Sequence, residues 1–370
     1  MNILVTGGAG FIGSYLVDTL IAQGNKVRIY DNLEPQVHQG HIPDYLNKDA
    51  EFIQGDVNNR EMLDKALTGI DVIFHEAAMV GVGQSMYEIA KYTNANTMGT
   101  AVLLDLVVNK HRDHIRKLVV AASMSEYGEG LYTCQNCGDL KPDLRREIDM
   151  KEGDWDPFCS KCKTPLSPKP TPETTPLQCN SIYAINKRDQ EDMTLNIGCS
   201  FQIPVVALRY FNVFGPRQSL SNPYTGVAAI FMSRLKANHN PVVFEDGKQS
   251  RDFVSVHDIV SANIAVMQDD RANYQIFNVG SGSSISIGDL GKLIIKITGS
   301  NQTLDINNKY RKGDIRHCFA DISKITKTLG WKPQVALEDG LKELIEWSKD
   351  KKSEDLFEES QKILKAKGVV

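Results

Sequence analysis

A tyrosine and a lysine one helical turn apart have the types and spacing needed for acid–base chemistry. Tyr183 and Lys187 form the pattern YxxxK, which places both side chains on one face of a helix. A free tyrosine titrates at about pH 10, and a neighbouring ammonium favours the phenolate, so we expect Lys187 to activate Tyr183. Ser123 ends an apolar stretch, 117–122, where its hydroxyl can share a substrate proton with Tyr183. These three residues are the predicted catalytic set.

Three glycines follow the first apolar stretch of the chain. Gly7, Gly10 and Gly13 stand in the segment GGAGFIG. The first permits a tight turn, the second lets backbone N–H groups approach a pyrophosphate, and the third lets a helix pack closely on a strand. Asp31 follows about twenty residues on, where a carboxylate accepts hydrogen bonds from the adenosine ribose and repels a 2′-phosphate. The pattern therefore predicts NAD rather than NADP.

Two shorter motifs extend this cofactor site. Asp56 and Val57 end the third expected strand, where they could meet the adenine edge. Ala77 and Ala78 in HEAA are small enough to line the pyrophosphate side. Two structural alternatives stay open, because Asp56 could instead cap the next helix and His75 is expected to be a hydrogen-bonded histidine at a strand end rather than a catalyst.

Four cysteines form two CxxC pairs separated by about twenty residues, the spacing of a zinc knuckle pair. The pairs are Cys134 with Cys137 and Cys159 with Cys162. Four thiolates close a tetrahedron and leave no open position for catalysis, so we expect one structural zinc per chain. Chance pairing and redox-active thiols are the alternatives.

The elements that must position these residues alternate between strand and helix. A helix is expected over 11–22, and the remaining helices lie between six strands. The expected strands are 2–6, 26–30, 51–53, 71–75, 117–122 and 205–209, with shorter elements after about residue 212. This alternation predicts an α/β fold with a doubly wound, Rossmann-like parallel sheet.

The expected division of the chain follows from where this alternation holds. We expect an NAD-binding domain over 1–208, interrupted by a zinc-knuckle-like insert at 129–176 that shows neither helical nor strand periodicity. The rest, 209–370, is expected to be mainly a smaller substrate-binding lobe. The charged stretch 337–365 has apolar residues at helical spacing and predicts a surface helix.

Composition limits the classes of function. The chain has 370 residues, 41% of them apolar, and a net charge of −4. Without basic stretches interleaved with aromatic residues, nothing favours a nucleic-acid partner. The longest apolar runs fall short of the roughly 18 residues of a membrane span, and a first strand beginning at Asn2 leaves no room for a secretion signal. We expect a soluble, cytoplasmic protein that acts on small molecules.

Taken in order, the motifs resemble the extended short-chain dehydrogenase/reductase family, in its NAD-dependent nucleotide-sugar epimerase/dehydratase branch. The resemblance covers nearly the whole chain apart from the insert, and is strongest to 4-epimerases of the UDP-hexose or dTDP-L-rhamnose type. The matching segments are GGAGFIG, HEAA, NTMGT, SMSEYG, YAINK, RYFNVFGPRQ, RDFVSVHD and RKGD.

The resemblance implies NAD as cofactor, a nucleotide-diphosphate sugar as substrate and a homodimer formed through paired helices around 97–110 and Tyr183. A guanidinium fork suits a diphosphate, and a carboxylate suits ribose hydroxyls. The implied further cofactor contacts are Phe11, Ile12, Asn32 and Asn96. The implied substrate contacts are Ser125, Asn212 at the sugar diphosphate, Arg251, Arg311 and Asp314 at the nucleotide end, and Cys318 beside the sugar.

The reaction is narrowed by the residues that follow Ser123. Family members that eliminate water carry an Asp/Glu pair there, whereas this chain has Met124 and Ser125. A reversible inversion at C4 through a 4-keto sugar needs no such acid. Three alternatives stay open: a 4,6-dehydratase or decarboxylase that uses Glu126, a net oxidoreductase, and a non-catalytic NAD-binding regulator on the same fold.

Overall fold

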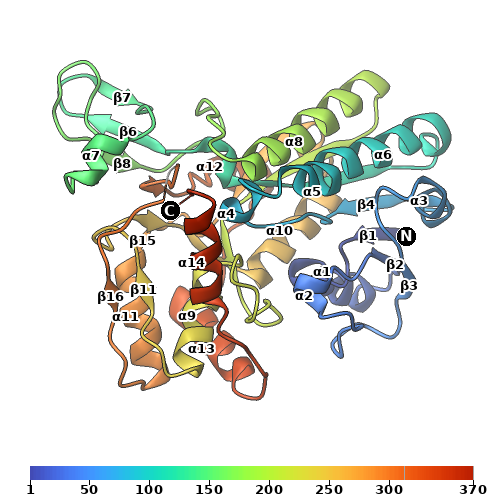
Figure 1. Cartoon of the computed structure of the whole chain (residues 1–370). Helices are drawn as coiled ribbons and strands as arrows, with labels where there is room; N and C mark the ends of the chain where they lie inside the picture. Colours follow the sequence, from blue (N-terminus) through green and yellow to red (C-terminus); the bar gives the residue numbers. More distant parts are fainter. Residues whose placement is uncertain (312, 370) are drawn as a thin grey trace.

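A seven-stranded parallel sheet forms the centre of the larger part of the molecule (Figure 1). The computed structural model describes residues 1–311 and 313–369, so Lys312 of the RKGD motif lies outside the described residues. The strand order is β3-β2-β1-β4-β5-β9-β14. The chain adds β2 and β3 on one side of β1 and then crosses to add β4 and the later strands on the other side. The strands are β1 (Asn2–Thr6), β2 (Lys26–Asp31), β3 (Glu51–Gln54), β4 (Val72–His75), β5 (Lys117–Ser123), β9 (Val205–Tyr210) and β14 (Gln275–Val279). The predicted Rossmann-like sheet is confirmed.

Alternation along the central strands directs apolar side chains to both faces of the sheet. In β5, Leu118 and Val120 pack with α3 and α6, whereas Val119 packs with α1 and α10. Both faces are therefore dry, as parallel sheets require. The helical segments are α1 (Phe11–Ala22), α2 (Pro35–His38), α3 (Arg60–Leu67), α4 (Val82–Ser85), α5 (Ile89–Thr93), α6 (Gly99–Leu106), α8 (Ile182–Phe201), α10 (Val256–Gln268) and α12 (Ser323–Leu329), with π-helical turns at Asn94–Met98 and Val107–His111 and 3₁₀ turns at Met124–Tyr127 and Asp270–Ala272.

The sheet takes up one strand that the sequence pattern did not indicate. β14 pairs in parallel with β9, so α10, β14 and α12 complete the first sheet although they come from the second half of the chain. We propose that 1–208 is the cofactor-binding part of the chain and 209–370 mainly the substrate-binding part, although α10, β14 and α12 of the second part pack with the first.

The smaller lobe has its own apolar core, built from α9, α11 and α13 around short strands. Its elements are β10 (Asn212–Phe214), α9 (Val227–Lys236), β11 (Val242–Val243), β12 (Ser250–Arg251), β13 (Phe253–Ser255), β15 (Ile285–Ser286), α11 (Ile287–Thr298), β16 (Asp305–Ile306), β17 (His317–Cys318), α13 (Leu337–Ser348) and α14 (Phe357–Ala366). The prediction of a single surface helix over 337–365 is wrong. The segment forms two separate helices, α13 and α14, and each buries an apolar face, through Leu344 and Leu364 respectively.

The insert between β5 and α8 folds as a small antiparallel module. It contains β6 (Leu131–Cys134), β7 (Gly138–Leu140), α7 (Glu147–Lys151) and β8 (Ser167–Lys169), with strand order β7-β6-β8. Figure 1 shows it at the upper left, beside the smaller lobe and away from β1 to β3.

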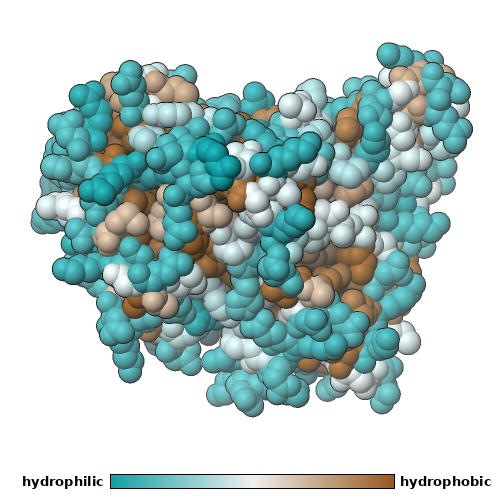
Figure 2. All heavy atoms as spheres, turned by 180° about the vertical axis from the view of Figure 1, so that it is seen from behind, coloured by the Kyte–Doolittle hydropathy of each residue, from teal (hydrophilic) through white to brown (hydrophobic). Residues whose placement is uncertain are grey.

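The molecular surface is mainly hydrophilic on the face seen in Figure 2, where apolar residues show in separate patches. Among the described residues, no helix has both the length and the apolar character that crossing a membrane requires.

Candidate active site

The three predicted catalytic residues line one cavity together with the glycine loop. The cavity has a volume of about 600 Å³ and includes Ser123, Tyr183 and Lys187. It lies at the carboxyl ends of the strands, where β1 and β4 diverge and where doubly wound folds bind their ligands. Cavities of this size accommodate small molecules.

Ser123 is held by the turn that follows its strand. It is the last residue of β5 and the N-cap of the 3₁₀ turn Met124–Tyr127. The Ser125 hydroxyl donates to Ser123 Oγ at 2.9 Å, and the Ser123 backbone N–H donates to Glu126 Oε1 at 2.8 Å. This capping box fixes the hydroxyl at the edge of the cavity.

Tyr183 and Lys187 enter the cavity from the first two turns of α8. Burial raises the pKa of Tyr183 to about 12, an effect that its hydrogen bond with Ser123 opposes. Lys187 Nζ donates to the Ala121 carbonyl at 2.8 Å. Burial lowers the pKa of Lys187 to about 8, while the carboxylates of Glu76 and Glu126 counteract this effect. The lysine is therefore still mainly protonated at neutral pH. It can supply the positive charge that a tyrosinate at Tyr183 needs nearby.

A buried arginine fixes α8 against the sheet. Arg209 on β9 donates to both carboxylate oxygens of Glu191, at 2.8 and 2.6 Å, and Glu191 lies one helical turn beyond Lys187. Glu126 Oε2 lies 3.7 Å from Arg209 Nε. Burial and the Glu191 charge raise the pKa of Glu126 well above its ordinary range. Neither Glu191 nor Arg209 was predicted as a site residue, because the only sequence feature that marks each of them is a single charge within a strand or helix.

A second carboxyl group, from Glu76, lines the cavity itself. Its Oε1 accepts from the Tyr210 hydroxyl at 2.9 Å, and Tyr210 in turn accepts from Asn263 Nδ2 at 2.7 Å. Burial raises the pKa of Glu76 to about 7, while Tyr210 and the Lys187 charge oppose this shift. The HEAA motif led to predictions for His75, Ala77 and Ala78, but not for Glu76.

The glycine loop can pack closely on its own backbone and on the HEAA segment only because it lacks side chains. Gly7 has φ of +70°, and a Cβ there would lie 2.7 Å from the Ala77 backbone N. A Cβ on Gly13 would lie 2.3 Å from the Gly7 carbonyl oxygen. Asp31 accepts from the backbone N–H groups of Ala9 and Leu33 at 3.0 and 2.8 Å. The loop, the start of α1 and this fixed carboxylate fit a dinucleotide.

Most of the other predicted cofactor residues also line the cavity: Gly10, Phe11, Ile12, Gly13, Asn32, Asp56, Val57, Ala77 and Ala78. Asp56 does not cap α3, whose N-cap is Asn59. Asn96 lies behind the cavity, where its side chain pairs with both backbone groups of Met79. His75 is confirmed as a buried, hydrogen-bonded histidine at a strand end.

The predicted substrate residues fall into two groups. Ser125 and Asn212 line the cavity. Arg251, Arg311, Asp314 and Cys318 lie beyond its described lining, in the smaller lobe.

Each residue of the second group already has a partner. Arg251 donates to the carbonyls of Ser250, Ile315 and Arg316. Arg311 Nε lies 2.9 Å from Asp314 Oδ2. The Cys318 thiol is buried 3.9 Å from Thr171 Oγ1 of the insert.

The four predicted metal ligands come together at the tip of the insert. The sulfur atoms of Cys134, Cys137, Cys159 and Cys162 all lie within 4.8 Å of one another. Cys134 and Cys162 sulfurs are 3.4 Å apart, well beyond the about 2.0 Å of a disulfide. A hydrogen bond from Thr164 lowers the pKa of Cys162 to about 6. The cluster is a candidate metal site.

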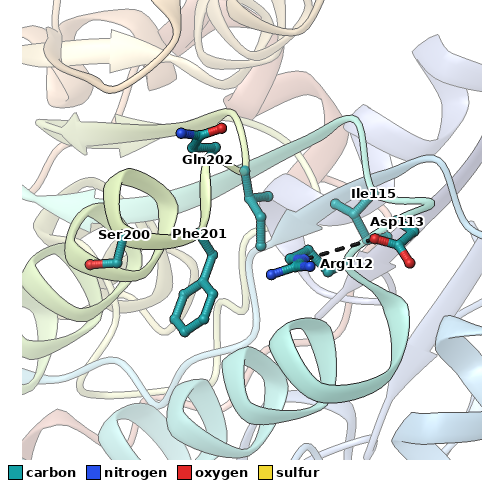
Figure 3. A pocket seen from close by; sticks show the side chains of 7 residues that line it. Arg112, Asp113, Ile115, Ser200, Phe201 and Gln202 are labelled. Carbon is teal, nitrogen blue, oxygen red and sulfur yellow. Dashed lines mark ion pairs between the residues drawn. The ribbon is translucent and has the colours of Figure 1, made fainter.

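A second hollow lies at the opposite end of α8 from Tyr183 and Lys187, between the end of that helix and residues 112–115 (Figure 3). Arg112 and its neighbour Asp113 form an ion pair at 3.8 Å on one side of this hollow. None of the predicted site residues lines it, so it contributes nothing to the catalytic geometry.

Comparison with known proteins yields consistent matches. Residues 3–146 match the model of the NAD dependent epimerase/dehydratase family, and residues 165–344 match that of GDP-mannose 4,6 dehydratase. The dTDP-L-rhamnose 4-epimerase of Burkholderia thailandensis is 34% identical over 355 residues, which cover 94% of each chain. A putative UDP-glucose 4-epimerase of Methanocaldococcus jannaschii is 30% identical over 94% of this chain and 98% of its own. The crystal structure of the Thermotoga maritima UDP-glucose 4-epimerase with UDP-glucose aligns with a TM-score of 0.77, at 32% identity, over 94% of this chain and 98% of that one.

Proposed function

Because the chain belongs to the NAD-dependent epimerase/dehydratase family, we propose that it inverts C4 of a nucleotide-diphosphate sugar through a transient 4-keto sugar. The proposed substrates are a UDP-hexose, a UDP-N-acetylhexosamine or a dTDP-6-deoxyhexose. Relatives named for UDP-glucose and dTDP-L-rhamnose support this range.

The placement of Glu126 is the observation that favours epimerisation over elimination of water. Its carboxyl is fully buried, caps the Ser123 backbone and faces Arg209. It does not line the described part of the cavity, where Met124 and Ser125 stand instead. A dehydratase needs a general acid at the leaving hydroxyl, and Glu126 is directed away from that place.

The catalytic residues divide the proton chemistry among them. Tyr183 accepts the C4 hydroxyl proton and returns it, and Ser123, at the end of β5, orients that hydroxyl. Protonated Lys187 supplies the positive charge that favours the tyrosinate form of Tyr183. NAD, when bound, supplies acceptance and return of a hydride at C4. Since the net reaction consumes no reducing equivalent, one bound NAD serves repeated turnovers.

We propose that the cysteine cluster holds one structural zinc. Zinc–thiolate bonds of about 2.3 Å place the sulfurs of a tetrahedron roughly 3.8 Å apart, which agrees with a cluster spanning 4.8 Å. All four ligands are thiols, which leaves no position for a substrate oxygen.

We also propose a homodimer that pairs α6 and α8 of two copies. Met98 and Ile185, on the π-helical turn before α6 and on α8, are 53% and 43% exposed. Large apolar side chains exposed on neighbouring helices are typical of an interface between copies.

Proton NMR of the anomeric signals tests the reaction directly. The purified protein is incubated separately with UDP-glucose, UDP-N-acetylglucosamine and dTDP-rhamnose, without added NAD. We expect the C4 epimer to appear from one of them. No epimer from any of them, but loss of water or carbon dioxide from another nucleotide sugar, would instead assign the chain to the dehydratases or decarboxylases. Accumulation of NADH absorbance would assign a net oxidoreductase, and retained NAD without turnover would assign a regulator.

A further inference from the structure

The two ends of the insert are hydrogen-bonded to one short stretch of the smaller lobe. The Gly130 N–H donates to the His317 carbonyl at 2.9 Å. On the returning strand, the Thr171 N–H donates to the Phe319 carbonyl at 2.8 Å, and Thr171 accepts from the Asp321 N–H at 3.0 Å. Residues 317–321 are thus held along their backbone by the insert, as Figure 1 shows from the closeness of β8 to the smaller lobe.

Glu129 links this stretch to the core of the cysteine module. Its buried carboxylate accepts from the backbone N–H groups of Arg316 and His317 at 2.7 and 3.2 Å. The same group accepts from the Tyr132 hydroxyl at 2.8 Å. Tyr132 packs in the module core with Cys134, so one carboxylate joins the metal cluster to the lobe.

A chain of buried charges makes a second connection. Arg145 of the insert donates to Glu245 Oε1 and to the Asp314 carbonyl, both at 2.8 Å. Glu245 Oε2 accepts from Arg316 at 2.8 Å, and Arg316 also donates to Asp156 of the insert at 2.6 Å. The side chains of Arg145, Glu245 and Arg316 are at most 4% exposed. Because each buried charge depends on the next, the insert and the lobe hold a single relative position.

The stretch held in this way carries the predicted nucleotide contacts. Arg251 donates to the carbonyls of Ile315 and Arg316, so its own place depends on them. Asp314, whose carbonyl Arg145 binds, pairs with Arg311. No predicted catalytic residue and no residue of the glycine loop takes part in these contacts.

We propose that the metal-bound cysteine module sets the affinity for the nucleotide end of the substrate by holding residues 313–318 through Glu129 and Arg145. This inference rests on the proposed function for the identity of the ligand. The module has few other means of staying folded, because its core cluster is small, with Tyr132, Cys134, Cys159 and Leu166 as its buried members. Loss of the metal releases residues 313–318, and NAD and the proton-transferring groups stay in place.

The first experiment measures nucleotide binding without turnover. UDP and dTDP are titrated calorimetrically into the NAD-bound full chain, as purified and after removal of zinc by a chelator. We expect the better of the two nucleotides to bind at least about tenfold more weakly to the metal-free protein, with unchanged NAD content. Equal affinity in both preparations would overturn the inference. Absence of binding to the zinc-loaded protein would overturn both it and the proposed nucleotide-sugar substrate.

Glu129→Gln tests the connection with zinc still bound. The amide presents N–H groups to backbone donors, so we expect KM to rise about tenfold while kcat changes less than about twofold. Glu129→Asp should recover part of the loss. Asp139→Asn is the matched control, since Asp139 is an exposed carboxylate of the same module whose partners, Lys169 and Thr133, both belong to the module rather than to the smaller lobe. A Glu129→Gln protein with full zinc and wild-type KM and nucleotide affinity would contradict the proposal, as would an equal fall in kcat.

Discussion

The catalytic edge of the sheet and the cysteine module are both functional regions, but they are held in place by different forces. Ser123 ends a strand that is buried along its whole length and packs between two large apolar cores. The module has a small core cluster of its own, with Tyr132, Cys134, Cys159 and Leu166 buried in it, and buried ion pairs and the four clustered thiols supply further contacts. We therefore expect the catalytic geometry to depend on global folding and the module to open by itself.

This difference separates what each region can be used for. Groups on a central parallel strand keep their positions to within the precision that proton transfer needs. A module with few apolar contacts should respond instead to its buried charges and to the zinc that we propose it holds.

Removing the Tyr183 hydroxyl should produce the largest effect. We expect Tyr183→Phe to lower kcat by about 10²–10⁴-fold, because no other group replaces the proton acceptor. The fold should be unaffected, since no backbone contact depends on that hydroxyl and α8 stays fixed by Arg209 and Glu191. Turnover and bound NAD are measured together. Residual activity within tenfold of the wild type would place the essential base elsewhere, with Glu76 the next candidate in the cavity.

Equivalent truncations in the two regions should differ in scope. Leu208→Ala removes a fully buried side chain from β9, and we expect it to lower the global free energy of unfolding by about 2–5 kcal/mol. Leu166→Ala removes a buried side chain of the module. It should leave global unfolding nearly unchanged while amide exchange in β6 and β8 accelerates. Denaturant unfolding and hydrogen exchange distinguish these outcomes, and a loss of global stability from both variants would mean that the module belongs to the main cooperative unit.

The same contrast explains which parts the sequence could predict. The glycine loop, YxxxK and the paired cysteines are short motifs whose spacing itself determines the geometry, and strands such as Asn2–Thr6 and helix Phe11–Ala22 were located at their observed bounds. Parallel-strand alternation also revealed most of the sheet. β14 was missed because it enters the sheet after a long excursion through the smaller lobe, and no local pattern records that return.

The contacts between the module and the lobe could not be predicted for a related reason. Glu129 and Arg316 are separated by 187 residues, and a single charge in a sequence is most often solvated. Only folding shows that Arg145 and Arg316 are buried and paired. The sequence likewise placed Arg251 and Asp314 on a nucleotide by resemblance, whereas the structure shows what supports them.

Acid should weaken the sheet through His75. This residue is buried between Thr6 and Thr100, with ring nitrogens 2.8 and 2.9 Å from their hydroxyls. Burial and the Lys187 charge lower the pKa of His75 from 6.5 to about 3. The unfolded chain therefore takes up a proton below about pH 6.5 that the folded chain refuses until about pH 3. The free energy of unfolding should fall by roughly 1.4 kcal/mol for each pH unit across that window.

Urea unfolding of the wild type and His75→Gln at several pH values measures this slope. The glutamine cannot titrate, so its slope should be smaller by the contribution of one proton. The module should respond in more acidic solution, because hydrogen bonds with His317 and Arg316 hold the pKa of Asp156 far below its usual range. Its contribution is present above about pH 3.8, the ordinary value, and is lost as the pH falls further. Exchange in β6 that accelerates before the sheet weakens would reverse this order.

The smallest effect should come from an exposed ion pair within the module. Lys169 Nζ lies 2.7 Å from Asp139 Oδ2 across β8 and β7, and the two side chains are 41% and 48% exposed. Exposed pairs contribute about 0–1 kcal/mol and are screened by salt. We therefore expect Lys169→Ala to accelerate amide exchange in β6 by less than about fivefold, an effect that vanishes at 1 M salt. If Lys169→Ala opened the module as far as Glu129→Gln does, charge pairing in general, and not its burial beneath the smaller lobe, would hold the module in place.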